Sequence, residues 1–180
     1  MLEKEKTVDY YTPDYLLDFK ENSFKISIEA FGNHLGGILV AKRLAENHYR
    51  FAIINEFGGK LMDFEIQNRK LKLNYAIDEL NRKIILNLLE KDFALLFSEN
   101  NLIEKEFIIQ ESVVLKSSNF IQNKDLYYYL KDQSLDSILL AKNKEKVRIN
   151  LKNTEQSFPQ IEIIHTKIPI KIYLHLLENE

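Results

Sequence analysis

The sequence predicts an α+β fold in which strands predominate and form a single antiparallel, curved sheet covered by one or more helices. Three observations predict it. Apolar and polar residues alternate over many short segments, one central segment changes to the 3.6-residue period of a helix, and alternating segments resume after it. Strands grouped on either side of a helix favour an antiparallel sheet over strand–helix–strand units.

The strand predictions rest on alternation. Apolar side chains at every second position from Phe24 to Ala30 indicate a strand with one buried face, and further alternating segments separated by turns extend to residue 75. The most regular segment runs from Ile168 to Leu176. Other strands are predicted at 107–110, 126–130, 137–141 and 147–151. Residues 1–14 are predicted to be an N-terminal tether, and residues 15–180 form one domain.

The helical period begins at Asp78. Apolar residues recur at helical spacing from Leu80 to Leu96, which predicts one helix of roughly 18 residues. We expect Asp78 to cap its N-terminus, and Glu79 to interact favourably with the helix dipole there.

The composition excludes several classes of protein. The 180 residues suffice for one domain with a sizeable core, and the 45% hydrophobic content indicates a folded chain. A net charge of −2 without an isolated basic run argues against nucleic acid as a partner. The sequence has no Cys, which excludes disulfides and thiolate metal sites, and no apolar run of about 18 residues that would span a membrane.

Motifs for catalysis are missing from the sequence. The four histidines are His34, His48, His165 and His175, and no two of them lie at metal-ligand spacing. Most carboxylates alternate with apolar residues, which is typical of the solvated face of a strand. We therefore predict that the protein is not an enzyme and uses no metal or cofactor.

The turn at residues 55–59 carries the most informative residue. Phe57 lies at the tip of a tight turn, followed by Gly58 and Gly59, which allow a sharp bend. Two interpretations remain open: the aromatic ring folds back onto the core, or it protrudes as an apolar wedge for a membrane or an acyl chain.

The residues around this turn resemble a known family. The segment from Tyr49 to Gly58 is similar to the strand and loop of the LolB outer-membrane lipoprotein receptors, in which a Tyr-Arg strand runs into an Asn-Pro-Leu-Gly turn. Residues 24–43 resemble the first two strands of that family, and residues 158–162 with 168–176 resemble its closing pair. The resemblance extends over residues 15–177, although Glu56 stands where the family often has Pro, and Phe57 replaces Leu.

The resemblance implies an incomplete β-barrel closed by helices, whose apolar interior receives the acyl chains of lipoproteins. LolB takes lipoproteins from the periplasmic carrier LolA and inserts them into the inner leaflet of the outer membrane. The implied partners are acylated lipoproteins, a LolA-like carrier and that leaflet. The implied protein is a monomer, lipid-anchored at the periplasmic face of the outer membrane. The anchoring Cys and a signal peptide are absent from this sequence, so we expect the given sequence to begin just after that Cys.

The same resemblance assigns candidate site residues. A protruding apolar residue between the third and fourth strands is needed for insertion in the family, and by position this role falls to Phe57 in a loop of Glu56, Phe57, Gly58 and Gly59. Alternation does not separate cavity-lining residues from core residues. The candidates for the acyl-chain cavity are Ile26, Ile28, Val40, Phe51, Ile53, Phe64, Leu71, Leu73, Leu88 and Phe93.

Three functions remain open at this point. The first is LolB-like acceptance and insertion of lipoproteins. The second is an envelope lipoprotein of the same fold that binds another lipid or a protein partner without inserting lipoproteins. The third is an interaction protein whose barrel is filled by its own side chains. An open cavity would favour the first two, and a filled one the third.

Overall fold

The computed structural model describes residues 2–178, with side chains described from residue 9 onward. Two helices are present in this range, α1 (Asp14–Leu17) and α2 (Lys83–Leu96). The strands are β1 (Leu2–Tyr11), β2 (Glu21–Ala30), β3 (Asn33–Ala45), β4 (His48–Ile54), β5 (Lys60–Gln67), β6 (Lys70–Ala76), β7 (Asn101–Ile109), β8 (Ser112–Ile121), β9 (Lys124–Lys131), β10 (Ser134–Lys142), β11 (Lys144–Lys152), β12 (Gln160–His165) and β13 (Ile170–Leu176).

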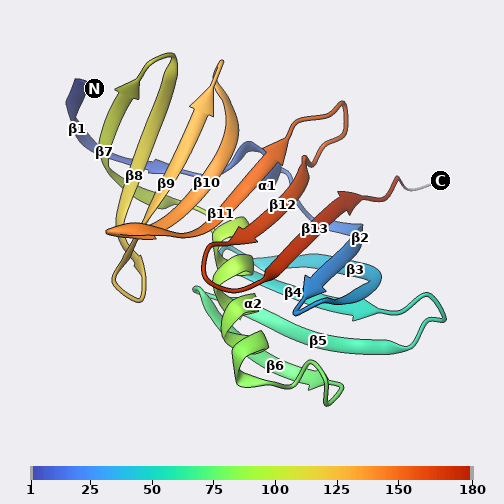
Figure 1. Cartoon of the computed structure of the whole chain (residues 1–180). Coiled ribbons are helices and arrows are strands. Elements are labelled where there is room, and N and C mark those ends of the chain that lie inside the picture. Colours follow the sequence, from blue (N-terminus) through green and yellow to red (C-terminus); the bar gives the residue numbers. More distant parts are fainter. Residues whose placement is uncertain (1, 179–180) are drawn as a thin grey trace.

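All the strands belong to one antiparallel sheet. Its 13 strands follow the order β1-β7-β8-β9-β10-β11-β12-β13-β2-β3-β4-β5-β6. Two meanders, β2–β6 and β7–β13, are joined where β13 pairs with β2. The edge strands β1 and β6 do not pair with each other, so the sheet curves without closing (Figure 1). The predicted open, curved antiparallel sheet with a covering helix is confirmed.

The strands with the clearest alternation form the centre of the sheet. Phe24, Ile26 and Ile28 of β2 are all buried, and their neighbours in the sequence face the other side. Ile172 of β13 lies opposite Ile28, and Leu174 lies opposite Ile26. Because successive side chains of a strand point to opposite faces, this register places one continuous apolar surface on the inner side of the sheet.

The N-terminal segment differs from the prediction. Residues 2–11, assigned from the sequence to a tether, form the edge strand β1, in which Tyr11 lies opposite Asn101 of β7. An edge strand pairs on one side only and needs no regular apolar face, so its sequence carries a weak pattern. The tip of α1 then buries Leu16 in the core, and Phe19 follows it.

Helix α2 is shorter than predicted, and the expected cap at Asp78 is wrong. Residues 78–80 form a separate turn, in which the amides of Leu80 and Asn81 donate to the carbonyl of Ile77. Arg82 is extended and precedes the helix, and its side chain makes no capping hydrogen bond. The helical spacing of the apolar residues therefore spans a turn and a helix, because a turn of this kind preserves the spacing locally.

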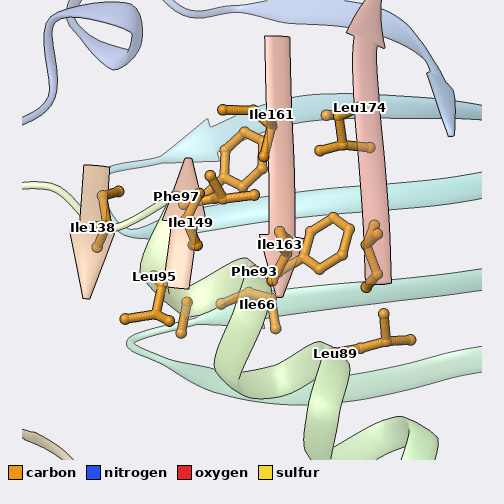
Figure 2. Close-up of a cluster of buried hydrophobic side chains, with 14 of the residues drawn as sticks. Ile66, Leu89, Phe93, Leu95, Phe97, Ile138, Ile149, Ile161, Ile163 and Leu174 are labelled. Atoms are coloured by element: carbon orange, nitrogen blue, oxygen red, sulfur yellow. The ribbon is translucent and has the colours of Figure 1, made fainter. Parts of the chain in front are cut away.

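The core lies between α2 and the concave face of the sheet. Figure 2 shows the rings of Phe93 and Phe97 beside the strand β12, where Ile161 and Ile163 lie. On the opposite wall, the Phe93 ring lies 4.7 Å from that of Phe51 and 5.2 Å from that of Phe64 (centroid distances). Both contacts are edge-to-face, the geometry that aromatic quadrupoles favour. Aromatic packing thus holds the C-terminal half of α2 against β4 and β5.

Replacing Phe93 by Ala should be among the most destabilising single changes in the chain. The ring is fully buried, and a Phe-to-Ala change in a core costs about 3–5 kcal/mol because it leaves a cavity. Equilibrium denaturation with urea measures the loss. The exposed Leu17→Ala variant is the control and should change stability by less than about 0.5 kcal/mol. A loss below about 1 kcal/mol for Phe93→Ala would contradict this account of the core.

A polar cluster fixes the chain where α2 ends. Arg43 donates two hydrogen bonds to the carboxylate of Glu99, at 3.0 and 2.9 Å, and the hydroxyl of Tyr49 donates a third. The Asn47 side chain bonds the backbone of Glu99 in both directions. The β3–β4 turn is therefore fastened to the residues that follow α2.

The cluster perturbs the carboxylate of Glu99. Burial alone would raise the pKa of this group, but the hydrogen bonds from Arg43, Tyr49 and the Asn47 backbone outweigh it, so the pKa lies below its ordinary value. Burial and the adjacent carboxylate raise the pKa of Tyr49. The ionised Glu99 is therefore the stable form in the fold.

Replacing Glu99 by Gln should weaken the acid dependence of stability. Because the folded-state pKa is depressed, the ionised Glu99 stabilises the fold above the ordinary value of 4.5, and this contribution is lost as the pH falls through the folded-state pKa. At pH 7 we expect Glu99→Gln to lose about 1.5–3 kcal/mol, and the difference from the unmodified protein should shrink below about pH 4. Urea unfolding at a series of pH values measures it, with the exposed Glu29→Gln as control. A constant difference across that range would refute the linkage.

Candidate functional site

An apolar cavity lies between the N-terminal half of α2 and the sheet. It has a volume of about 320 Å³, at the small end of the roughly 300–1,000 Å³ found for ligand pockets. Its walls come from β2, β3, β13 and the helix. The apolar lining residues are Ile28, Ala30, Phe31, Leu35, Leu80, Ile84, Ile85, Leu88, Leu89, Ile170 and Ile172.

Exposed apolar side chains surround the mouth of this cavity. Phe31, in the β2–β3 turn, is 55% exposed, and Ile84, in the first turn of α2, is 46% exposed. The turn is tied to the neighbouring loop, because the Phe31 amide donates to the carbonyl of Pro169 at 3.2 Å. Glu79 and Arg82 also line this cavity and supply polar groups. The cavity thus combines an apolar interior with a mixed entrance.

The structure separates the cavity candidates into three groups. Ile28 and Leu88 line the cavity. Ile26, Phe51, Ile53, Phe64 and Phe93 are fully buried in the packed core, and Leu71 and Leu73 of β6 pack against that core. Val40 lies on the other face of the sheet, since its neighbours Leu39 and Ala41 are the buried residues of β3. The lining residues Ile84, Ile85 and Leu89 were missed, because a helix face that borders a void has the same apolar pattern as one that borders a core.

The β4–β5 turn presents Phe57 to solvent. Its side chain is 96% exposed. The turn is organised by Asn55, whose side-chain oxygen accepts hydrogen bonds from the amides of Phe57 and Gly59 at 3.0 and 2.8 Å. Gly58 has a φ of 81°, which a side chain would disfavour. The aromatic ring is thus held outward on an ordered turn, with Glu56 also exposed beside it.

The strand register places this turn at the same end of the sheet as the cavity mouth. Ile54, the last residue of β4, lies opposite Ile38, and β3 runs from there back to its start at Asn33 beside the β2–β3 turn. Met62 of β5 lies opposite Ala76, from which the chain leads to α2. The β4–β5 turn projects from the sheet at the right of Figure 1. Phe57 and the cavity mouth therefore share one end of the molecule.

A second depression lies over the outer face of β2, β3 and β13. Its volume is larger, about 670 Å³, but Lys25, Ser27, His34, Glu56 and His175 line it together with apolar residues. An acyl chain gains most where its surroundings are apolar and enclosed. The smaller cavity beside α2 is therefore the better candidate for an apolar ligand.

A buried ion pair connects α2 to the last residue of β12. His165 lies 3.0 Å from both carboxylate oxygens of Asp92 through Nε2, and 2.8 Å from the carbonyl of Ile170 through Nδ1. Burial would lower the pKa of His165, but the hydrogen bonds to Asp92 and Ile170 outweigh it and raise the pKa. Burial raises the pKa of Asp92. Since both ring nitrogens face acceptors, the pair holds a proton and fastens the helix to the sheet.

Other arrangements are not found among the described residues. Within residues 9–178, no three His, Asp or Glu side chains come together in a way that could hold a metal ion. No helix in residues 2–178 is long and apolar enough to cross a membrane.

Solved structures share this fold. A LolA superfamily protein from Nitrosomonas europaea superposes with a TM-score of 0.56 over 88% of this chain and 83% of its own, at 8% sequence identity. A DUF1329 family protein from Desulfovibrio piger superposes with a TM-score of 0.52 over 92% of this chain and 87% of its own, also at 8% identity. No family model and no curated protein matches the sequence. The chain has the LolA-like fold, an open antiparallel sheet with a helix in its concave side.

Proposed function

We propose that the protein is a LolB-like lipoprotein receptor, which takes the acyl chains of lipoproteins into the apolar cavity and inserts them into a membrane. The observation that carries this proposal is the open apolar cavity beside α2 in a LolA-like fold. The resemblance of residues 49–58 to the LolB loop supports the insertion step. In this proposal the donor is a LolA-like periplasmic carrier, and the site of action is the periplasmic face of the outer membrane.

Transfer by such a protein requires only a gradient of affinity. Each methylene moved from water into an apolar cavity gains about 0.8 kcal/mol, so an acyl chain passes to whichever site buries more of it. The side chains that would receive the chain come from β2, β13 and α2. The first turn of α2, where Ile84 is exposed, is the natural point of entry.

The exposed Phe57 supplies a second element of this function. A fully exposed aromatic ring on an ordered turn has no role in the stability of the core. Burying such a ring in a bilayer gains about 1.5–3 kcal/mol. Because the turn and the cavity mouth lie at one end of the molecule, a membrane that receives Phe57 would also lie close to the opening through which an acyl chain leaves.

Filling the cavity should abolish binding of an acylated ligand. Ala30 lines the cavity, so Ala30→Phe would place a ring inside it. Excluding even two methylenes costs about 1.6 kcal/mol, so a fluorescent triacylated lipopeptide should bind at least tenfold more weakly. The control is Ala52→Phe, the same substitution in β4, where the side chain points to the outer face of the sheet. The deacylated peptide should bind neither protein. Unchanged binding to Ala30→Phe would place the ligand elsewhere, and no binding to the unmodified protein would refute the proposal.

Replacing Phe57 by Glu should separate binding from delivery. Since Phe57 contacts no core residue at 96% exposure, the variant should keep its stability and its affinity for the lipopeptide. Transfer of the lipopeptide to vesicles should fall by at least about tenfold, because the ring's burial in the bilayer is lost and a charge is added. Leu17→Glu changes another exposed apolar residue and should have no effect. Wild-type transfer by Phe57→Glu would favour the alternative function, lipid or partner binding without insertion.

A further inference from the structure

A second small cavity, here called the lysine cavity, lies next to the apolar one. It has a volume of about 140 Å³ and is lined by Leu88, Lys91, Lys124, Leu140, Lys146, Val147, His165, Lys167 and Ile168. Leu88 also lines the apolar cavity, so this side chain lies between the two spaces. The volume corresponds to about four to five times the roughly 30 Å³ that a water molecule occupies in the liquid. It is large enough for a small tetrahedral anion.

The topology explains why so many lysines meet here. Lys124 begins β9, Lys142 ends β10, and Lys144 begins β11, where it lies opposite Lys142. Lys146 follows on β11, and Lys167 comes just after the end of β12. In the antiparallel sheet, all these strand termini lie at the same end of the strands. Lys91 approaches from α2 and completes a group of six lysines.

These lysines are not neutralised by the protein itself. Among the described side chains, none of the six forms an ion pair with a carboxylate. The neighbouring carboxylates are already held by other cations: Asp125 by Lys116 at 3.0 Å, Glu145 by Arg148 at 2.7 Å, and Asp92 by His165. In a chain of net charge −2, this is a local concentration of uncompensated positive charge.

The positive charges of these lysines lower the pKa values of their neighbours. Burial and then the charges of Lys91, Lys142 and Lys146 lower the pKa of Lys124. The charge of Lys167, followed by burial and by further lysines, lowers the pKa of Lys146. Positive charges held close together destabilise the ionised forms of the amines, and a bound anion would relieve the repulsion.

We infer that the lysine cavity binds a phosphate group. The chemistry that fits it is a compact oxyanion with several acceptor oxygens, because several ammonium donors from different elements surround one space with apolar walls. Resting on the acyl-chain binding proposed above, the phosphate belongs to an anionic lipid, whose acyl chain passes Leu88 into the apolar cavity. A free phosphate ion would use the same donors.

The test compares three probes by titration calorimetry at fixed ionic strength: short-chain phosphatidic acid below its micelle concentration, the uncharged diacylglycerol with the same chains, and inorganic phosphate. The variant is Lys124→Gln/Lys146→Gln. Its matched control is Lys131→Gln/Lys152→Gln, which removes two exposed charges at the opposite ends of the same strands. Melting by circular dichroism should show both variants folded, since Lys124 and Lys146 form no ion pair that the change would break.

We expect the unmodified protein and the control to bind phosphatidic acid at least about tenfold more tightly than diacylglycerol, and the Lys124→Gln/Lys146→Gln variant to lose that preference. Inorganic phosphate should bind the unmodified protein and compete with phosphatidic acid. A preference that survives in the variant, or failure of both phosphatidic acid and inorganic phosphate to bind the unmodified protein through these lysines, overturns the inference.

The results with the three probes also distinguish the phosphate site from the acyl-chain binding on which it rests. One outcome is that diacylglycerol binds, that Ala30→Phe abolishes this binding, and that phosphatidic acid binds no more tightly than diacylglycerol. The apolar cavity is then functional and the phosphate site is refuted. The other outcome is that inorganic phosphate binds through the lysines and that neither lipid binds more tightly than inorganic phosphate does. The phosphate site then holds for a free ion, and acyl-chain binding fails.

Discussion

The coverage of a large concave sheet by a single short helix is the constraint on which the structure depends. Thirteen strands present one inner apolar face, and α2, with 14 residues, extends for only about 21 Å. The two halves of the helix cover this face differently. Phe93 and Phe97, in and after its C-terminal half, reach both walls of the sheet and fill the space between them. The N-terminal half carries smaller aliphatic residues such as Ile85 and Leu88, and the cavity lies there. The void thus follows from the distribution of side-chain volume along one helix.

Polar contacts reinforce the same asymmetry. The Asp92–His165 pair ties the helix to the β12–β13 side of the sheet, and Glu99 ties the chain after it to Arg43 of β3. Asp92 lies in the C-terminal half of α2, and Glu99 follows the end of the helix. At the other end α2 begins without a side-chain cap and without an acidic residue in its first turn. A helix start that lacks these contacts is held less firmly. The part of the covering element with the fewest constraints is therefore the part that borders the cavity mouth, which suits a site that must admit and release a chain.

The sequence predicted the parts of this fold that repeat, and missed the parts that depend on contacts between distant segments. Alternation identified β2 and β13, because both of their faces have a fixed environment. It failed for β1, an edge strand, and at Asp78, where a turn preserved helical spacing. The exposed Phe57 was identified as a candidate from its turn, although only the structure shows that the ring points outward. Whether an apolar residue such as Leu88 or Phe93 lines a void or fills a core depends on the opposite wall, which no local pattern encodes.

The cluster of lysines, too, could not be predicted from a local sequence pattern. They are scattered from residue 91 to residue 167, so no basic run appears in the sequence, and the low net charge argues against an anionic partner until the strand ends are brought together. In the proposed arrangement the two adjacent cavities contribute different things to recognition. Burial of apolar surface is non-directional, so the cavity beside α2 would provide affinity without fixing which end of an amphiphile enters first. Charged hydrogen bonds are directional, so the lysine cavity would fix the orientation. Because both spaces border Leu88, one ligand with an apolar chain and a phosphate would satisfy both, and a neutral lipid would leave the lysines unpaired.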